Sequence, residues 1–301
     1  MNLQAWLSAI RLRTLPLALA SIGMGSFLAA SLGLFSLKIF ILCSLTTILL
    51  QILSNIANDY GDSVHGADSV EREGPKRAVQ SGLISARQML QAIILLALLS
   101  FGTGIYLLYE ALHDASRQTI LFFLGLGVLS ILAAITYTAG KKPYGYIGLG
   151  DISVFVFFGW VGVLGTFYLH TKGFYWPNLL PATSCGLFAV AVLNINNIRD
   201  IESDRKAGKR SIPVRVGKEK AVLYHWVLLA LGVAAAVWYV LLTYTSIFQF
   251  LFLLIVPLLW KNARGVWQKH KAAELDPYLK QMALTTLFFI LTFGIGQLIH
   301  W

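Results

Sequence analysis

Two stretches of this 301-residue chain place carboxylates and amides at the ends of long apolar runs. The first stretch holds Asn55, Asp59 and Asp62, and Asp68 follows a few residues later. Because residues three or four apart share one face of a helix, the first three side chains would project in one direction. Carboxylates at membrane depth are costly to retain, so these residues are candidates for a functional role.

The second stretch repeats this spacing with Asn196, Asp200 and Asp204, and Asn197 lies in the same neighbourhood. Oxygen ligands of this kind suit a hard cation, and Mg²⁺ is typically bound by one or two carboxylates together with substrate phosphates and water. Acids at helix ends also occur solvated at the membrane surface, paired with nearby Arg and Lys. Two matched stretches favour the first interpretation, and we expect them to face each other across one site for metal and diphosphate.

Basic residues follow both acidic stretches and are candidates to bind phosphate. Arginine binds phosphate through a bidentate fork and lysine as a point charge. Lys209 and Arg210 stand out because the preceding Gly208 lets the backbone approach a ligand closely. The others are also explained as solvated loop residues or determinants of membrane orientation. The set consists of Arg72, Lys76, Arg77, Arg199, Arg205, Lys206, Lys209 and Arg210.

A third group of polar residues lies between two apolar runs in the middle of the chain. Tyr137 and Lys141 are four residues apart, a spacing that anchoring at the lipid headgroups explains more simply than catalysis. Asp151 enters the next apolar run, where a carboxylate needs a partner or a role. The six histidines lack zinc-ligand spacing and no P-loop sequence occurs, so neither a zinc site nor a P-loop ATPase is expected.

The composition places these residues in a membrane protein. Hydrophobic residues make up 57% of the chain and charged residues 13%, and the mean hydropathy is +0.69. Soluble domains carry about 25% charged residues, so the chain is too apolar for that class. The net charge of +10 does not indicate nucleic-acid binding, because no basic run stands apart from the apolar segments. Cys43 and Cys185 lie within apolar runs and are expected to be buried thiols.

A membrane-spanning helix needs about 20 mostly apolar residues. Nine segments are candidates, and we expect them to form one integral membrane domain over residues 1–301. The eighth is short and contains Pro257. No small-residue cleavage site follows the basic N-terminal segment, so no removable signal peptide is expected. The predicted spans are approximately 15–35, 38–58, 89–109, 119–138, 148–170, 180–197, 221–243, 246–260 and 281–300.

The loops between these spans differ in charge on the two sides. All but three of the 24 Lys and Arg residues lie on the side of the N-terminus, the exceptions being Lys38, Arg117 and Lys172. The positive-inside rule therefore predicts a cytoplasmic N-terminus and an external C-terminus in the inner (cytoplasmic) membrane. All but two of the 14 acids also lie on this side, which the rule does not explain.

The first four spans and the next four are expected to be two copies of one unit, followed by a single extra helix. In each copy a long polar loop follows the second span and adjoins one acidic stretch. Parallel repeats of this kind occur in membrane proteins and are related by an axis along the membrane normal. The two loops would then form a polar cap over one site on the cytoplasmic side.

With these features the chain resembles the UbiA superfamily of intramembrane prenyltransferases. The resemblance spans nearly the whole chain, and within the superfamily it is most similar to the enzymes that prenylate 1,4-dihydroxy-2-naphthoate in menaquinone synthesis. In one respect the chain departs from many relatives: its first acids are spaced by three and then six rather than by four, which leaves either Asp62 or Asp68 to complete a metal site. The segments that carry the resemblance are Arg13-Thr-Leu-Pro16, Asn55 to Asp62, Arg77-Ala-Val-Gln80, Tyr137 to Tyr146, and Asn196 to Asp204 with Gly208-Lys-Arg-Ser211.

The resemblance implies an all-α bundle that transfers a polyprenyl group from polyprenyl diphosphate to 1,4-dihydroxy-2-naphthoate, releasing CO₂ and diphosphate and giving demethylmenaquinol. It implies that two Mg²⁺ ions bridge the diphosphate, and that Lys141, Arg205 and Lys209 stabilise it as it leaves. Asn55, Tyr137 and Asp151 are candidates to orient the ring or to assist removal of its proton. The implied metal ligands are Asp59, Asp62, Asp68, Asp200 and Asp204. The implied substrate-binding residues are Arg13, Arg77, Asn196, Asn197, Arg199, Arg205, Lys209 and Arg210.

Two alternatives remain open at this stage. The acceptor of the prenyl group is either the naphthoate or another aromatic ring, such as 4-hydroxybenzoate, homogentisate or a porphyrin-type ring. A transporter for a small anion or a divalent cation would also combine basic loops with acids in a membrane. Transport is disfavoured because a transporter needs polar residues near the midplane, and the apolar runs here carry almost no charge inside.

Overall fold

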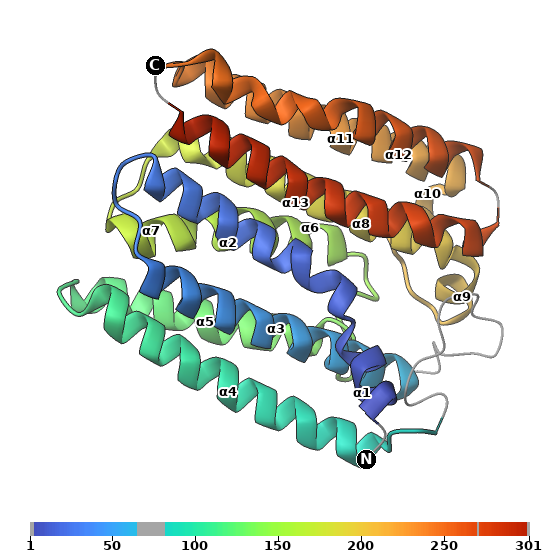
Figure 1. Ribbon diagram of the computed structural model, residues 1–301. Helices are drawn as coiled ribbons and strands as arrows, with labels where there is room; N and C mark the ends of the chain where they lie inside the picture. The colour runs from blue at the N-terminus through green and yellow to red at the C-terminus, as the bar shows by residue number, and fades with distance from the viewer. Residues whose placement is uncertain (1–2, 65–81, 270, 300–301) are drawn as a thin grey trace.

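The computed structural model describes residues 3–64, 82–269 and 271–299, with the exception of the Arg13 side chain. Within these ranges every regular element is a helix, which confirms the predicted all-α class (Figure 1). Asp68, Arg72, Lys76 and Arg77 lie outside the described residues.

Nine crossings of a membrane are compatible with the helices of the described ranges. Eight helices are long and apolar enough to span a bilayer, and α1 (Leu3–Ile10) and α2 (Leu15–Ala30), bent by 46° at η1 (Leu12–Thr14), form a ninth candidate. The next three spans are α3 (Leu37–Val64), α4 (Ala86–Leu112) and α5 (Arg117–Thr136). The fifth span consists of α6 (Gly150–Val154), η2 (Phe155–Leu164) and α7 (Gly165–Thr171).

The remaining spans belong to the C-terminal half. They are η3 (Trp176–Asn178) with α8 (Leu179–Arg199), α11 (Lys218–Leu242), η4 (Ile247–Ile255) with α12 (Val256–Gln268), and η5 (Ala272–Leu275) with α13 (Asp276–Leu298). Two short helices, α9 (Ile201–Lys206) and α10 (Ile212–Val216), connect α8 to α11. The eighth span is longer than predicted because Pro257 lies in the first turn of α12, where a missing N–H costs no hydrogen bond.

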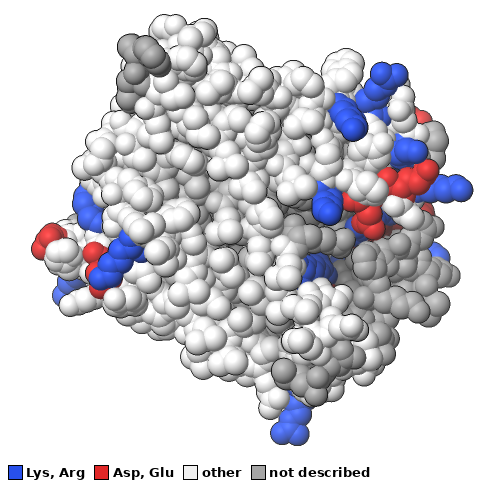
Figure 2. Space-filling model, viewed as in Figure 1, with Lys and Arg blue, Asp and Glu red and all other residues white. Residues whose placement is uncertain are grey.

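The spans lie side by side, and the charged residues gather at the ends of the bundle. α1, α9 and α10 lie at the end where α3 and α8 also end, which we call the polar end (Figure 1, right). Figure 2 shows Lys, Arg, Asp and Glu mainly at this end, a smaller group at the opposite end, and a broad band without charge between them. The C-terminal end of α13 lies opposite the polar end, as an odd number of crossings requires.

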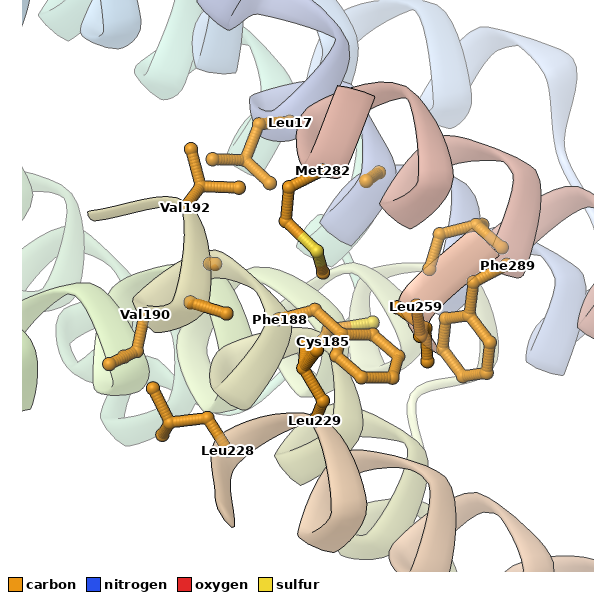
Figure 3. Packing of buried hydrophobic residues seen from close by; sticks show 14 of the residues in the cluster. Leu17, Cys185, Phe188, Val190, Val192, Leu228, Leu229, Leu259, Met282 and Phe289 are labelled. Atoms are coloured by element: carbon orange, nitrogen blue, oxygen red, sulfur yellow. The ribbon is translucent and has the colours of Figure 1, made fainter. Parts of the chain in front are cut away.

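The main hydrophobic core surrounds α8, which packs against α11, α13 and η2. Phe188 of α8 meets Phe289 of α13 edge to face, with ring centroids 5.0 Å apart (Figure 3). Phe252 of η4 also contacts Phe289. Aromatic pairs of this geometry contribute about 0.5–1.5 kcal/mol beyond the area that they bury. The core therefore holds α8, and with it the second acidic stretch, in a fixed position.

The fifth span is π-helical along η2, and its glycines bring it close to α8. A Cβ atom added at Gly159 would lie 2.7 Å from the carbonyl oxygen of Ala182, and one added at Gly186 would lie 2.8 Å from that of Phe155. Only glycine allows this approach. The Ser21 hydroxyl of α2 donates a hydrogen bond to the Phe158 carbonyl. Side chains of this kind satisfy backbone groups that an irregular membrane helix leaves free.

Candidate active site at the polar end

A cavity of about 440 Å³ opens among α2, α3, α4, α5, the fifth span and α8. At the polar end it is lined by Arg11, Asn55, Asn58, Asp62, Tyr137, Tyr146, Asp151, Asn196, Asn197, Asp200, Asp204 and Lys209. Away from that end the lining is mostly apolar and reaches Cys43 of α3. Because Cys43 precedes Asn58 by 15 residues and a helix rises 1.5 Å per residue, the cavity extends for roughly 22 Å along α3. Residues of both acidic stretches thus line one cavity.

The first acidic stretch lies within α3, which continues to Val64 instead of ending near residue 58. The Asn55 amide donates to the Ile10 carbonyl at 2.8 Å and to the Thr14 hydroxyl at 2.9 Å, so it fastens the segment before α2 to α3. Asp59 forms an ion pair with Arg11 of that segment. Asn55, predicted to act on the ring, therefore also has a structural role.

Lys209 joins the two acidic stretches. Its Nζ atom lies 3.0 Å from Asp62 and 3.5 Å from Asp204, and it lies 5.0 Å from the centre of the Tyr146 ring. The Tyr146 hydroxyl donates to Asp62 at 2.8 Å. This one ammonium group thus balances a carboxylate from each stretch at the end of the cavity.

The second acidic stretch bends where α8 gives way to α9. Asp200 is the link between the two helices, with φ −97° and ψ 12°. The backbone bonds from Asp200 N–H to Asn196 and from Asp204 N–H to Asp200 are kept, at 3.1 and 2.8 Å. The four-residue spacing therefore still turns Asn196, Asp200 and Asp204 toward the cavity, as the sequence predicts.

Arg199 is buried beside this bend, with 1% of its side chain exposed. It donates two hydrogen bonds to Asp200, at 2.7 and 2.8 Å, and one to the Asn196 side chain at 2.8 Å. A further bond, at 2.6 Å, reaches Asp276 at the start of α13. Arg199 is not part of the cavity lining, so its position is that of a partner that orients Asp200.

The pKa of Asp204 is raised to about 6, mainly by burial and in part by the carboxylates of Asp200 and Asp62, while Lys209 acts in the opposite direction. Three carboxylates near one another in a partly desolvated site repel each other and favour bound cations. Together with the Asn196 and Asn197 amides they form the oxygen-rich ligand set that suits Mg²⁺. Within the described ranges, no three acidic, His or Cys side chains already surround a single point.

Tyr137 and Asp151 line the cavity from the side of the fifth span. Burial raises the pKa of the Tyr137 hydroxyl above its ordinary value, and the nearby Asp151 adds to this shift. The Tyr137 hydroxyl lies close to Gly150, where an added Cβ would come within 2.7 Å of its oxygen. Asp151 accepts a hydrogen bond of 3.1 Å from the Tyr224 hydroxyl of α11. The sequence analysis did not predict that Tyr224 would be a partner of Asp151.

Besides Arg199, further predicted basic residues lie outside the cavity lining. Lys141, Arg205 and Arg210 are exposed, and Arg205 pairs with Glu202 at 3.0 Å. Arg77 and Asp68 lie beyond the described ranges, as does the Arg13 side chain, so their predicted roles stay predictions. Sequence reasoning missed the roles of Arg11 and Asp276, because a basic residue before a first span and an acid in a first helical turn are both common.

The sequence of the chain is similar to those of known proteins. The sequence model of the UbiA prenyltransferase family matches residues 18–295. The chain is 48% identical to the 1,4-dihydroxy-2-naphthoate octaprenyltransferase of Haemophilus influenzae, over 99% of this chain and 97% of that protein. It is 46% identical to the protein of the same name from Escherichia coli, over 98% and 96%.

Solved structures agree in fold. A UbiA homologue from Aeropyrum pernix, determined in its apo form, superposes with a TM-score of 0.70 at 17% identity, covering 95% of this chain and 97% of that one. A UbiA homologue from Archaeoglobus fulgidus bound to GPP and Mg²⁺ gives 0.63 at 19% identity, covering 98% and 99%. On the family match and the two close relatives, the chain belongs to the UbiA prenyltransferase family.

Proposed function

We propose that this protein transfers a polyprenyl group from polyprenyl diphosphate to 1,4-dihydroxy-2-naphthoate, with loss of CO₂ and diphosphate, to give demethylmenaquinol. The observation that carries the proposal is the single cavity with an acidic end and an apolar body. The acidic end suits a diphosphate with its cations, and the apolar body suits an isoprenoid tail. Two relatives at 46–48% identity carry the name of this naphthoate activity, which supports the acceptor.

Asp62, Asp200 and Asp204, together with Asp59, are the residues that would hold Mg²⁺. The metal would supply positive charge to the leaving diphosphate, as metal clamps do in other transfers of this kind. The UbiA homologue from Archaeoglobus fulgidus is bound to GPP and Mg²⁺, which supports the use of a divalent cation by this chain. Asp68 remains a further candidate ligand.

The basic residues of this chain act on the leaving group. Lys209, held between the two acidic stretches, brings an ammonium group to the diphosphate as its bond to the allylic carbon breaks. Lys141, Arg205 and Arg210, with Arg13 and Arg77, would attract the anionic substrates to this end. Asn196 and Asn197 line the cavity there and would hold phosphate oxygens or metal-bound water through their amides.

The ring would react beside Tyr137 and Asp151. As the C–O bond breaks, the electron-rich ring attacks the allylic carbon, and departure of CO₂ restores the aromatic ring. The apolar cavity wall keeps water from the cationic carbon. Asn55, Tyr137 and Asp151 orient the ring hydroxyls, and Asp151 is placed to accept the proton of a ring hydroxyl while the new C–C bond forms and to return it to that oxygen as CO₂ leaves.

The membrane setting follows from the substrates. We place the protein in the inner (cytoplasmic) membrane as one domain, with its N-terminus and polar end on the cytoplasmic side and its C-terminus outside. The positive-inside rule supports this orientation. The water-soluble ring acid would then enter from the cytoplasm, while the tail, which gains about 0.8 kcal/mol per buried CH₂, stays in an apolar environment.

The test is a transfer assay with purified full-length protein, Mg²⁺, a polyprenyl diphosphate and one acceptor at a time. We expect a prenylated, decarboxylated quinol from 1,4-dihydroxy-2-naphthoate, and no product from 4-hydroxybenzoate or homogentisate. Turnover of another ring in place of the naphthoate would show that the acceptor is wrong. Ion flux in proteoliposomes without any prenyl transfer would favour a transporter and overturn the enzyme assignment.

A further inference from the structure

Ser211 lines the cavity near its acidic end and carries an enclosed hydroxyl. The residue is only 7% exposed. Among the residues that the structure describes, its Oγ atom has no hydrogen-bond partner. Buried hydroxyls in proteins are nearly always hydrogen-bonded, so an unmatched one on a cavity-lining residue indicates a ligand toward which it turns on binding.

Capping a helix, the usual role of a serine at a helix N-terminus, does not account for the Ser211 hydroxyl. It is the N-cap residue of α10, where a serine side chain normally accepts a hydrogen bond from the second or third helical N–H. Here the second helical residue is Pro213, which has no N–H, and the Ser211 side chain makes no cap bond. Ser85, the N-cap of α4, provides the contrast, because its hydroxyl accepts from the Gln88 N–H within a capping box.

The backbone around Ser211 is fixed on both sides. The Lys209 N–H donates to the Asp204 carbonyl at 2.9 Å, and the Arg210 N–H donates to the Tyr146 carbonyl at 2.8 Å. The Ser211 carbonyl accepts from the Arg215 N–H at 3.1 Å. A group held in place before its ligand arrives loses little freedom on binding, so this hydroxyl is suited to recognition.

The surroundings indicate the charge of the ligand. A hydroxyl donor pairs most strongly with an anionic oxygen. Two residues before Ser211, the Lys209 ammonium lies between Asp62 and Asp204, at the end of the cavity where the diphosphate would bind. The acceptor ring is assigned instead to the side of Tyr137 and Asp151. The anionic oxygen next to Ser211 is therefore one of the diphosphate.

We propose that Ser211 is a substrate-binding residue whose hydroxyl donates a hydrogen bond to the diphosphate of the prenyl donor. This inference rests on the proposed function, because it requires a diphosphate at the acidic end. The hydroxyl would hold the leaving group in register with Lys209 before the allylic bond breaks. It forms no covalent bond and transfers no proton.

The experiment compares Ser211→Ala and Ser211→Thr with Ser85→Ala in the full-length protein. Binding of inorganic diphosphate with Mg²⁺ is measured by calorimetry, and KM is measured separately for donor and acceptor. A hydrogen bond to a charged group changes affinity by about ten- to a hundredfold, so Ser211→Ala should weaken diphosphate binding and raise the donor KM by at least roughly tenfold. The acceptor KM should not change, Ser211→Thr should restore most of the affinity, and Ser85→Ala should match the unaltered protein.

The outcomes separate this inference from the proposed function. If the unaltered protein binds no diphosphate, both the function and the role of Ser211 are wrong. If it binds diphosphate and Ser211→Ala binds equally well within twofold, only the role of Ser211 is wrong. A rise in the acceptor KM with an unchanged donor KM would place the hydroxyl against the acceptor and would also overturn the inference.

Discussion

The two acidic stretches have similar spacing, but the structure builds them differently. The first lies on one continuous helix, α3, and its Asp59 pairs with Arg11, whose side chain is 23% exposed. The second lies across a bend at Asp200, and its counter-cation Arg199 is 1% exposed and also bound to Asp276. Both carboxylates are buried, so the two pairs differ in their cations: Arg11 is partly exposed to water, whereas Arg199 is enclosed in the interior.

This difference suggests a division of labour between the stretches. Asp59 can exchange Arg11 for a metal ion, because the Arg11 side chain is partly exposed and its guanidinium can be hydrated once released. Asp200 keeps two hydrogen bonds to Arg199 on one side, which leaves its remaining lone pairs for the cavity. The second stretch therefore provides a metal ligand whose orientation is already fixed. The first stretch provides a ligand that changes its partner when the metal binds.

The largest expected effect comes from removing one carboxylate from each stretch. Asp59→Asn and Asp200→Asn should each reduce prenyl transfer by about a hundredfold or more, because each removes a metal ligand. Asp200→Asn should also lower stability by about 3 kcal/mol, because it leaves the buried Arg199 partly unpaired, and Asp59→Asn should lower it less, because Arg11 is partly exposed to water. Turnover and thermal unfolding in detergent measure the two effects. Near-normal turnover at saturating Mg²⁺ would contradict the metal assignment, and equal stability losses would contradict the contrast.

A smaller effect is expected from Asp276, which touches the site only through Arg199. Asp276→Asn should lower turnover by roughly tenfold and raise the Mg²⁺ concentration needed for half-maximal activity, since Asp200 would lose its fixed orientation. Asp114→Asn is the control, because that carboxylate is 87% exposed and lies outside the cavity. If Asp276→Asn lowers stability but leaves the Mg²⁺ requirement unchanged, Asp276 has a structural role only.

Asp204 allows a test by pH. Its pKa, raised by burial to about 6, means that about half of the molecules carry the proton at pH 6 and almost none at pH 8. A metal needs the carboxylate, so binding of Mg²⁺ should release about half a proton from this group at pH 6 and close to none at pH 8. Calorimetry in buffers of different ionisation enthalpy measures the release. Asp204→Asn should abolish the pH dependence, and its persistence in that variant would assign the proton to another group.

The smallest effect is expected from Arg205, which is exposed, whereas Arg199 of the same stretch is buried. Arg205 is 54% exposed and, among the described residues, pairs with Glu202 on the same helix, an arrangement that contributes about 0.3–0.5 kcal/mol. Arg205→Gln should therefore change the donor KM by no more than about threefold. A rise of roughly tenfold in the donor KM, similar in size to the effect of Asp276→Asn on turnover, would support the predicted role of Arg205 in substrate binding.

The sequence was sufficient for features that depend on neighbouring residues. Apolar runs predicted the spans, and the spacing of Asn196, Asp200 and Asp204 predicted a shared face that the structure retains despite the bend. The sequence did not predict which residues hold these carboxylates in place. Arg11 and Asp59 are separated by 48 residues, and Arg199 and Asp276 by 77. Such pairs arise from helix packing, which periodicity along one helix does not encode.

The π-helical segment of the fifth span has a consequence for changes in chain length. A π turn holds roughly one residue more than an α turn. Deleting one residue between Phe155 and Leu164 would therefore convert a π turn into an α turn without breaking the helix. It would therefore leave Asp151 and Thr166, both of which line the cavity, in nearly the same relative orientation, whereas a deletion within an α-helix rotates the flanking residues by about 100°. The π-helical segment is thus a place where the fifth span can lose one residue and still present both of its ends to the cavity.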